Sequence, residues 1–129
     1  MASLKETLAT KIPLLHRDNI YTTRTRIDVR PPGWEKYTGE ELYWPVFFRI
    51  RYSDHTQTKY DLALVLDVNS ANSEAEGEEL RESLQKFDRR FDTHLSRIRR
   101  RVVLAEKTDR AELVQTLEAS VRRLLSVTK

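Results

Sequence analysis

The stretch RIRRR places four arginines within residues 97–101, namely Arg97, Arg99, Arg100 and Arg101. A guanidinium group binds a carboxylate or a phosphate through parallel hydrogen bonds, so a cluster of arginines is suited to an anionic partner. If this stretch is helical, none of the four arginines has an Asp or Glu three or four residues away. Solvated helices usually place charges of opposite sign at those spacings. We therefore hypothesise that the cluster finds its counter-ions outside its own helix.

Other basic residues precede this cluster on the same expected helix. On a helical wheel of about 100° per residue, some of them form a basic edge, and a shorter acidic edge lies on the opposite flank. The basic edge contains Lys86, Arg90, Arg97 and Arg101, and the acidic edge contains Asp88, Asp92 and Glu106. The candidate anion-binding residues are Lys86, Arg89, Arg90, Arg97, Arg99, Arg100 and Arg101.

Three interpretations of this basic edge remain open. Cations in the C-terminal half of a helix stabilise its macrodipole, but that effect decays within a turn of the helix end. An acidic protein surface, or a second copy of the chain laid antiparallel, would supply carboxylates to the basic edge. A row of guanidinium groups would also follow the phosphates of a nucleic-acid backbone. Arginine fits a carboxylate and a phosphate equally well.

The residue patterns that catalysis and metal binding require are missing from the sequence. His16, His55 and His94 lie far apart, and none has the spacing of paired metal ligands. Ser53, Asp54 and His55 are adjacent in an expected loop, so they cannot converge on one substrate atom as a catalytic triad does. Turn formation explains these three residues. We therefore expect no enzyme, no metal, no cofactor and no small-molecule substrate.

Aromatic side chains are concentrated in and beside an expected loop, in the stretch PPGWEKYTGEELYW at residues 31–44. Trp34 and Tyr37 lie within the loop itself. An aromatic residue in such a place either covers the hydrophobic core or stays exposed as a contact for a ligand, base or partner. We keep Trp34 and Tyr37 as candidate contact residues.

The composition describes a small globular chain. Its 129 residues, 39% of them apolar, are enough for one domain with one core. No apolar run approaches the roughly 20 residues of a membrane-spanning helix, so we expect no membrane. The chain has no cysteine, and its first residues do not form the apolar core of a secretory signal. These features favour a cytoplasmic location.

Three segments in the first half have clear periodicities. Leu4, Leu8 and Ile12 predict a short amphipathic helix that ends near Pro13. Residues 19–30 alternate between apolar and polar types and predict one half-exposed strand. Residues 42–52 and 60–68 each present an unbroken apolar face, which predicts an antiparallel hairpin.

The hairpin register follows from keeping both apolar rows on one side of the sheet. Pairing Tyr52 with Tyr60 achieves this, and it places Arg51 opposite Asp61. We predict an ion pair between Arg51 and Asp61 that contributes no more than about 1 kcal/mol.

The second half reads as two helices. Ser73 and Glu76 fit a capping box, and apolar residues then recur at a mean spacing close to 3.6, from Leu80 to Ala105. This predicts one helix of more than thirty residues. Asp109 and Glu112 mark a second start, before the apolar positions Val114, Leu117, Val121 and Leu124. A short break between the helices favours an antiparallel hairpin.

These patterns predict a single α+β domain over residues 1–129. Residues 1–72 form the N-terminal helix and a three-stranded antiparallel sheet, and residues 73–129 form a helical hairpin whose long helix packs on the sheet. We predict a non-enzymatic interaction and assembly module that docks its long helix and arginine-rich edge onto an acidic protein or its own copy. The alternative is a nucleic-acid-binding protein that contacts phosphates through the basic helix.

Overall fold

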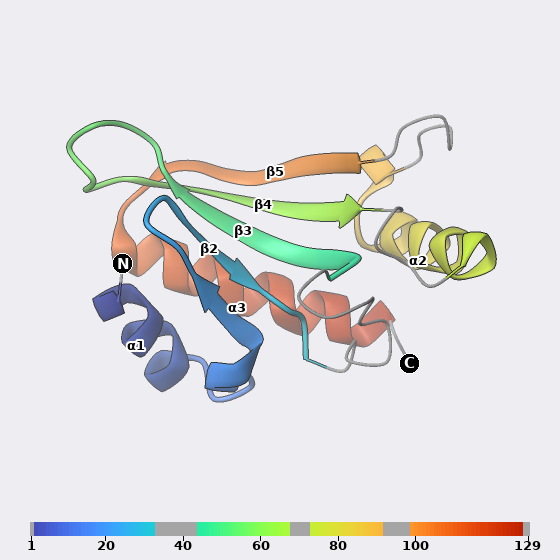
Figure 1. Cartoon of the computed structure of the whole chain (residues 1–129), viewed down its shortest axis with the longest axis horizontal. Helices are drawn as coiled ribbons and strands as arrows, with labels where there is room; N and C mark the ends of the chain where they lie inside the picture. Colours follow the sequence, from blue (N-terminus) through green and yellow to red (C-terminus); the bar gives the residue numbers. More distant parts are fainter. Residues whose placement is uncertain (1, 33–43, 68–72, 92–98, 128–129) are drawn as a thin grey trace.

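The computed structural model describes residues 2–32, 44–67, 73–91 and 99–127. Within these residues the chain forms an α+β fold with one five-stranded antiparallel sheet and three α-helices (Figure 1). The strands follow one another across the sheet in chain order. The elements are α1 (Ala2–Lys11), the 3-10 helix η1 (Arg17–Asn19), β1 (Ile20–Thr22), β2 (Arg26–Val29), β3 (Val46–Tyr52), β4 (Tyr60–Asp67), α2 (Glu74–Phe87), the 3-10 helix η4 (Arg89–Phe91), β5 (Arg99–Thr108) and α3 (Arg110–Val127).

The N-terminal helix forms as predicted. Leu4, Leu8 and Ile12 are all buried, and α1 ends at Lys11, before Pro13. Proline has no backbone N–H and its ring clashes with the preceding turn, so the helix cannot continue through it.

Residues 19–30 were predicted as one strand but form a tight hairpin. β1 and β2 pair antiparallel, with Ile20 opposite Val29. The turn is held by Thr23, whose hydroxyl accepts hydrogen bonds from the backbone N–H groups of Thr25 at 3.3 Å and Arg26 at 3.2 Å. A threonine side chain that binds nearby N–H groups offers the backbone an alternative to an extended ladder. This local turn overrides the alternating pattern.

The central hairpin has the register predicted from the sequence. Tyr52 of β3 pairs with Tyr60 of β4, and Arg51 pairs with Asp61. The ion pair predicted between Arg51 and Asp61 does not form. Instead, the Asp61 carboxylate accepts hydrogen bonds from the Ser53 hydroxyl at 2.7 Å and from the backbone N–H of Lys107 at 3.0 Å.

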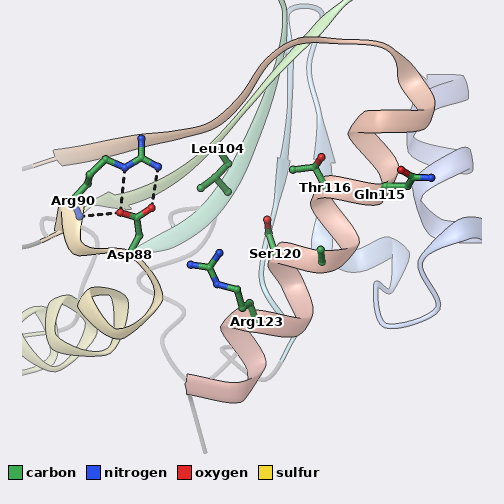
Figure 2. A pocket seen from close by; sticks show the side chains of 8 residues that line it. Asp88, Arg90, Leu104, Gln115, Thr116, Ser120 and Arg123 are labelled. Atoms are coloured by element: carbon green, nitrogen blue, oxygen red, sulfur yellow. Dashed lines mark hydrogen bonds and ion pairs between the residues drawn. The ribbon is translucent and has the colours of Figure 1, made fainter.

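The prediction of one long helix is wrong, because α2 ends at Phe87. The carboxylate of Asp88 accepts a hydrogen bond of 2.9 Å from the backbone N–H of Arg90, and two more from its guanidinium (Figure 2). An aspartate that binds the N–H two residues on forms a turn that competes with helix continuation.

Residues 99–108 form the strand β5, which pairs antiparallel with β4. The β-branched residues Val102 and Val103 favour a strand, and pairing with Leu64 places Val102 in the core. The spacing of Val102 and Ala105 fits a helix, but register shifts between β4 and β5 place them opposite Leu64 and Leu62, which both face the core. The fold therefore has five strands rather than three, and residues 73–129 are not a helical hairpin.

The second predicted helix exists as α3, but it packs on the sheet instead of pairing with a long helix. The Oδ1 atom of Asp109 accepts a hydrogen bond of 2.8 Å from the backbone N–H of Glu112, as the capping pattern predicted. Ser73 caps α2 in the same way, accepting from Glu76 at 3.1 Å. The residues of α3 that are completely buried are Leu113, Leu117, Val121 and Leu124.

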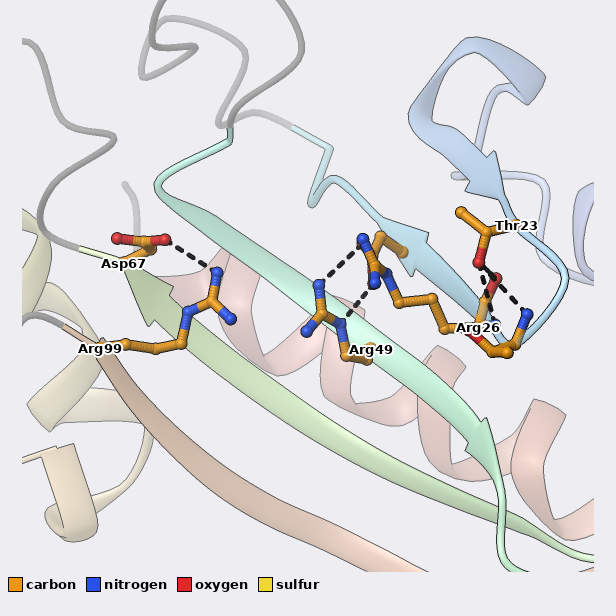
Figure 3. A network of polar contacts seen from close by, with 7 residues as sticks. Thr23, Arg26, Arg49, Asp67 and Arg99 are labelled. Atoms are coloured by element: carbon orange, nitrogen blue, oxygen red, sulfur yellow. Dashed lines mark hydrogen bonds and ion pairs between the residues drawn. The ribbon is translucent and has the colours of Figure 1, made fainter.

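The two faces of the sheet differ in what covers them. One face joins α1, α2 and α3 in a single hydrophobic core that includes Phe48, Ile50 and Leu64. The other face carries Phe47, Ala63 and Val65, which are buried but lie outside this core cluster. Figure 3 shows this second face toward the viewer, with α3 behind the sheet.

Candidate anion-binding face of the sheet

The sheet face opposite α3 carries arginines from three strands. We call it the arginine face, and its arginines are Arg26 of β2, Arg49 and Arg51 of β3, and Arg99 and Arg101 of β5. Their shared side follows from the strand register. Arg49 lies opposite Ala63, Arg101 lies opposite Val65, and alternate residues of a strand point to the same face.

Two of these arginines are held by one buried aspartate. Arg49 donates to both carboxylate oxygens of Asp28, at 2.8 and 3.1 Å, and the Nε of Arg26 donates to Asp28 at 3.2 Å. Arg49 also lies over the ring of Phe47, with its guanidinium carbon 4.9 Å from the ring centroid. Asp28 is 7% exposed and Arg49 is 9% exposed, so this pair is part of the framework and not a free binding group.

A second aspartate holds the first arginine of β5. Arg99 donates to the Oδ2 of Asp67 at 3.0 Å, across from it in the register (Figure 3). The side chain of Arg99 is 51% exposed. Solvent therefore weakens this ion pair, and Arg99 keeps donors available to a partner.

Arg51 and Arg101 are the two arginines of this face that remain without a carboxylate. Both are exposed, and within the described part of the chain neither forms an ion pair. Partial burial lowers the pKa of Arg51, the positive charges of Arg49, Arg101 and Arg26 lower it further, and the carboxylate of Asp28 opposes them by raising it. Arg26 is also the direct cross-strand neighbour of Arg51. Like charges at this distance repel, so an anion bound here would be stabilised.

The predicted cluster is divided among several places. Lys86 and Arg89 are exposed near the end of α2, and Arg90 is paired with Asp88. Arg100 points to the other side of β5 from its neighbours, and its Nε donates to the carbonyl oxygen of Arg90 at 3.0 Å. Arg97 lies outside the described residues, and so do the candidate aromatic contacts Trp34 and Tyr37. The hypothesis of one basic helical edge is therefore wrong.

The sequence did contain a signal for the missed arginines. In the stretch FRIRY, residues 48–52, Arg49 and Arg51 alternate with the apolar residues that face the core. Alternation alone places both arginines on the opposite face. What it did not reveal is that β5 would bring Arg99 and Arg101 to the same face, because β5 was assigned to a helix.

The Ser53, Asp54 and His55 stretch forms a turn, as the sequence indicated. The Oδ1 of Asp54 accepts from the backbone N–H of Thr56 at 3.1 Å and from its hydroxyl at 2.7 Å. The hydroxyl of Thr56 is the main cause that lowers the pKa of Asp54. Over the described ranges, no three His, Cys, Asp or Glu side chains are grouped as ligands of a metal ion.

The chain matches none of the protein-family models, curated proteins or solved structures with which we compared it. None of the described helices combines the length and the apolar character that crossing a membrane requires.

Proposed function

We propose that this chain is a non-enzymatic interaction module that binds an acidic protein surface through the arginine face. The observation that carries the proposal is that Arg51 and Arg101 form no ion pair with a carboxylate among the described residues. Both are exposed on the same face, and Arg51 lies in the positive field of three other arginines. Two buried or half-buried aspartates fix the neighbouring guanidinium groups, so the face is organised before a partner arrives.

The composition of the arginine face favours a protein over a nucleic acid. The apolar residues Phe47 and Val65 lie between the arginines, but at 5% and 1% exposure they support the face from within and do not reach a partner. Arginine itself is enriched in protein interfaces. Asp28 and Asp67 hold three of the five arginines, so only Arg51 and Arg101 remain without an ion pair among the described residues, which is too few to follow a continuous phosphate backbone.

The acidic surface can also belong to a second copy of the chain. The helix α2 contains Glu74, Glu76, Glu78, Glu79 and Glu82. Arg81 and Lys86 are the two basic residues of this helix, so α2 carries a net negative charge that the arginine face would attract. Light scattering over a concentration series decides whether the partner is the chain itself.

The double substitution Arg51→Gln and Arg101→Gln tests the proposal. A labelled polyglutamate peptide serves as the acidic probe in fluorescence anisotropy, at about 50 and about 200 mM salt. We expect the double variant to bind about tenfold more weakly, which corresponds to the loss of two partly exposed ion pairs. Single- and double-stranded nucleic acids of equal charge are titrated in parallel, and we expect weaker binding to both.

The matched control removes the same charge elsewhere. Lys86 and Arg89 are both exposed and lie near the end of α2, away from the arginine face. We expect the Lys86→Gln and Arg89→Gln double variant to bind the peptide as the unchanged chain does. An equal loss in both double variants would show non-specific attraction and overturn the proposal. Tighter binding to nucleic acid that depends on Arg51 and Arg101 would assign the face to phosphate instead.

The proposal keeps the cytoplasmic location that the sequence favours. Cell fractionation checks this point independently of the binding experiment. A protein recovered in the cytosolic fraction agrees with it, and recovery only outside the cytosol contradicts it.

A further inference from the structure

A cavity of about 430 Å³ lies on the helical side of the sheet, between η4, β5 and α3 (Figure 2). This volume falls within the range of small-molecule sites in proteins, about 300–1,000 Å³. The cavity is separate from the arginine face and shares no residue with it. Its lining residues are Asp88, Arg90, Leu104, Gln115, Thr116, Ala119, Ser120 and Arg123.

One side of α3 supplies most of the polar lining. Thr116, Ser120 and Arg123 succeed each other at spacings of four and three residues, so they share one face of the helix. Figure 2 shows the Ser120 hydroxyl and the Arg123 side chain directed away from α3 into the space beside β5 and η4. The apolar residues of α3 that enter the core lie on another face.

Ser120 contributes a hydroxyl group to the wall of the cavity. The residue is 8% exposed and lines the cavity. A buried serine on a helix commonly bonds the carbonyl four residues earlier, as a means of satisfying its hydroxyl. Among the described residues, Ser120 is not one of those whose buried side-chain atoms lack a hydrogen-bond partner, so its hydroxyl is open to the solvent of the cavity. A ligand oxygen would replace that solvent as the partner of the hydroxyl.

Arg123 supplies a positive charge in a fixed position. Its guanidinium carbon lies 4.2 Å from the ring centroid of Phe87, and it also donates a hydrogen bond to the carbonyl oxygen of Phe87. Neither contact neutralises its charge. Over the described ranges, Arg123 forms no ion pair with a carboxylate.

The one carboxylate of the cavity is already matched. Asp88 accepts from the backbone N–H of Arg90 at 2.9 Å and from its guanidinium at 3.1 and 2.9 Å. These bonds cancel the charge of Asp88 against that of Arg90. Arg123 therefore sets the sign of the remaining charge, which is positive.

We propose that this cavity binds a small anionic ligand through a carboxylate or phosphate group held by Arg123 and Ser120. The guanidinium of Arg123 offers paired N–H donors, and the Ser120 hydroxyl donates to a further oxygen. Leu104 and Ala119 give the rest of the ligand an apolar wall. The proposal does not depend on the function of the arginine face, which lies on the other side of the sheet.

Isothermal titration with inorganic phosphate and with succinate, each against chloride at the same ionic strength, tests the proposal. We expect one of the two probes to bind, and the stronger probe identifies the anionic group. Arg123→Gln removes the charge and is expected to weaken binding about tenfold or more. Ser120→Ala removes one donor and is expected to weaken binding about threefold.

Two further variants keep the outcome clear. Arg122→Gln removes the same charge from the adjacent exposed position, where Arg122 lies 3.9 Å from Glu118, and it should not change binding. Ala119→Phe fills the cavity from an exposed helix position and should abolish binding without removing a charge. If neither probe binds at about 10 mM, the Kd exceeds that concentration and is too weak for a specific site, which would overturn the proposal. Equal weakening by Arg122→Gln and Arg123→Gln would overturn it as well.

Discussion

The arginines of this chain differ in their partners. Those that are buried in ion pairs stabilise the fold, and those that are exposed without a carboxylate are candidates for binding a partner. Arg49 is buried against Asp28 and over Phe47, so its role is to shape the sheet surface. Arg51, two residues away on the same face, is exposed and lacks a carboxylate partner within the described residues. Identical side chains at adjacent positions of one face therefore do different things. Counting arginines in the sequence cannot distinguish them.

The buried pair of Asp28 and Arg49 makes a prediction about stability. Asp28→Asn preserves the shape but removes the charge that compensates two guanidinium groups. Leaving a buried charge uncompensated costs several kcal/mol, and we expect the free energy of unfolding to fall by about 3 kcal/mol. Urea denaturation measures this change. Glu118→Gln, which removes a carboxylate from an exposed pair with Arg122, should cost less than about 1 kcal/mol. Equal losses in the two variants would show that the Asp28 pair is solvated.

Because the pKa of Asp88 is lowered in the folded state, we expect the stability of the fold to depend on pH. The side-chain hydrogen bonds from Arg90 are the main cause that lowers the pKa of Asp88 below its ordinary value of 3.8. A depressed pKa stabilises the folded state above that ordinary value, and the contribution disappears as the pH falls through the lower folded pKa. We therefore expect Asp88→Asn to reduce stability at neutral pH. The difference from the unchanged chain should shrink as the pH falls below 3.8, and urea denaturation across this range tests it. A difference that stays constant with pH would contradict the assignment.

At the scale of elements, the hairpin and the helix starts could be predicted because local chemistry decides them. The unbroken apolar rows of β3 and β4 exclude a register shifted by one residue, because that shift would expose them. The observed pairing of Tyr52 with Tyr60 agrees with this constraint. The starts of α2 and α3 could be predicted because Ser73 and Asp109 are good acceptors for the free N–H groups of a first turn.

β5 could not be predicted because its conformation depends on a distant partner. The apolar residues from Leu80 to Ala105 recur at a helical spacing, and the first part of this pattern does form the helix α2. The same spacing therefore predicted that the helix continues through residues 99–108. Pairing of Val102 with Leu64 and of Val103 with Ala63 is a contact between strands that periodicity does not detect. The Asp88 turn was the local sign that the helix stops. Because β5 was missed, the arginine face was missed with it.

The cap of α3 gives a prediction at this scale. Asp109→Ala removes the acceptor for the backbone N–H of Glu112, and the loss of such a cap typically costs about 1 kcal/mol. We expect the cost to appear in the stability of the whole fold, since α3 supplies completely buried residues to the core. Chemical denaturation measures it, with Gln115→Ala at an exposed position of α3 as the control. A cost equal to that of the control would mean that solvent replaces the cap.

At the scale of the whole molecule, the net charge is only +3, but basic and acidic residues are concentrated on different surfaces. The arginine face lies on one side of the sheet, and five glutamates lie on α2. The cavity with Arg123 lies on the helical side, where β5 and α3 face each other. The sheet therefore separates two anion-attracting surfaces. A module with a protein partner on one face and a small ligand on the other would follow from this arrangement.

The separation predicts that the two surfaces act independently. A ligand that binds only the folded state stabilises it, and phosphate or succinate at ten times its Kd should raise the free energy of unfolding by about 1.4 kcal/mol. The Arg51→Gln and Arg101→Gln double variant should show the same increase, because distant sites that share no residues contribute additively. Arg123→Gln should lose it while still binding the polyglutamate peptide. Denaturation with and without the anion, at constant ionic strength, measures all three chains. If the increase disappears in the arginine-face variant and survives in Arg123→Gln, the anion binds to the arginine face and the cavity is not its site.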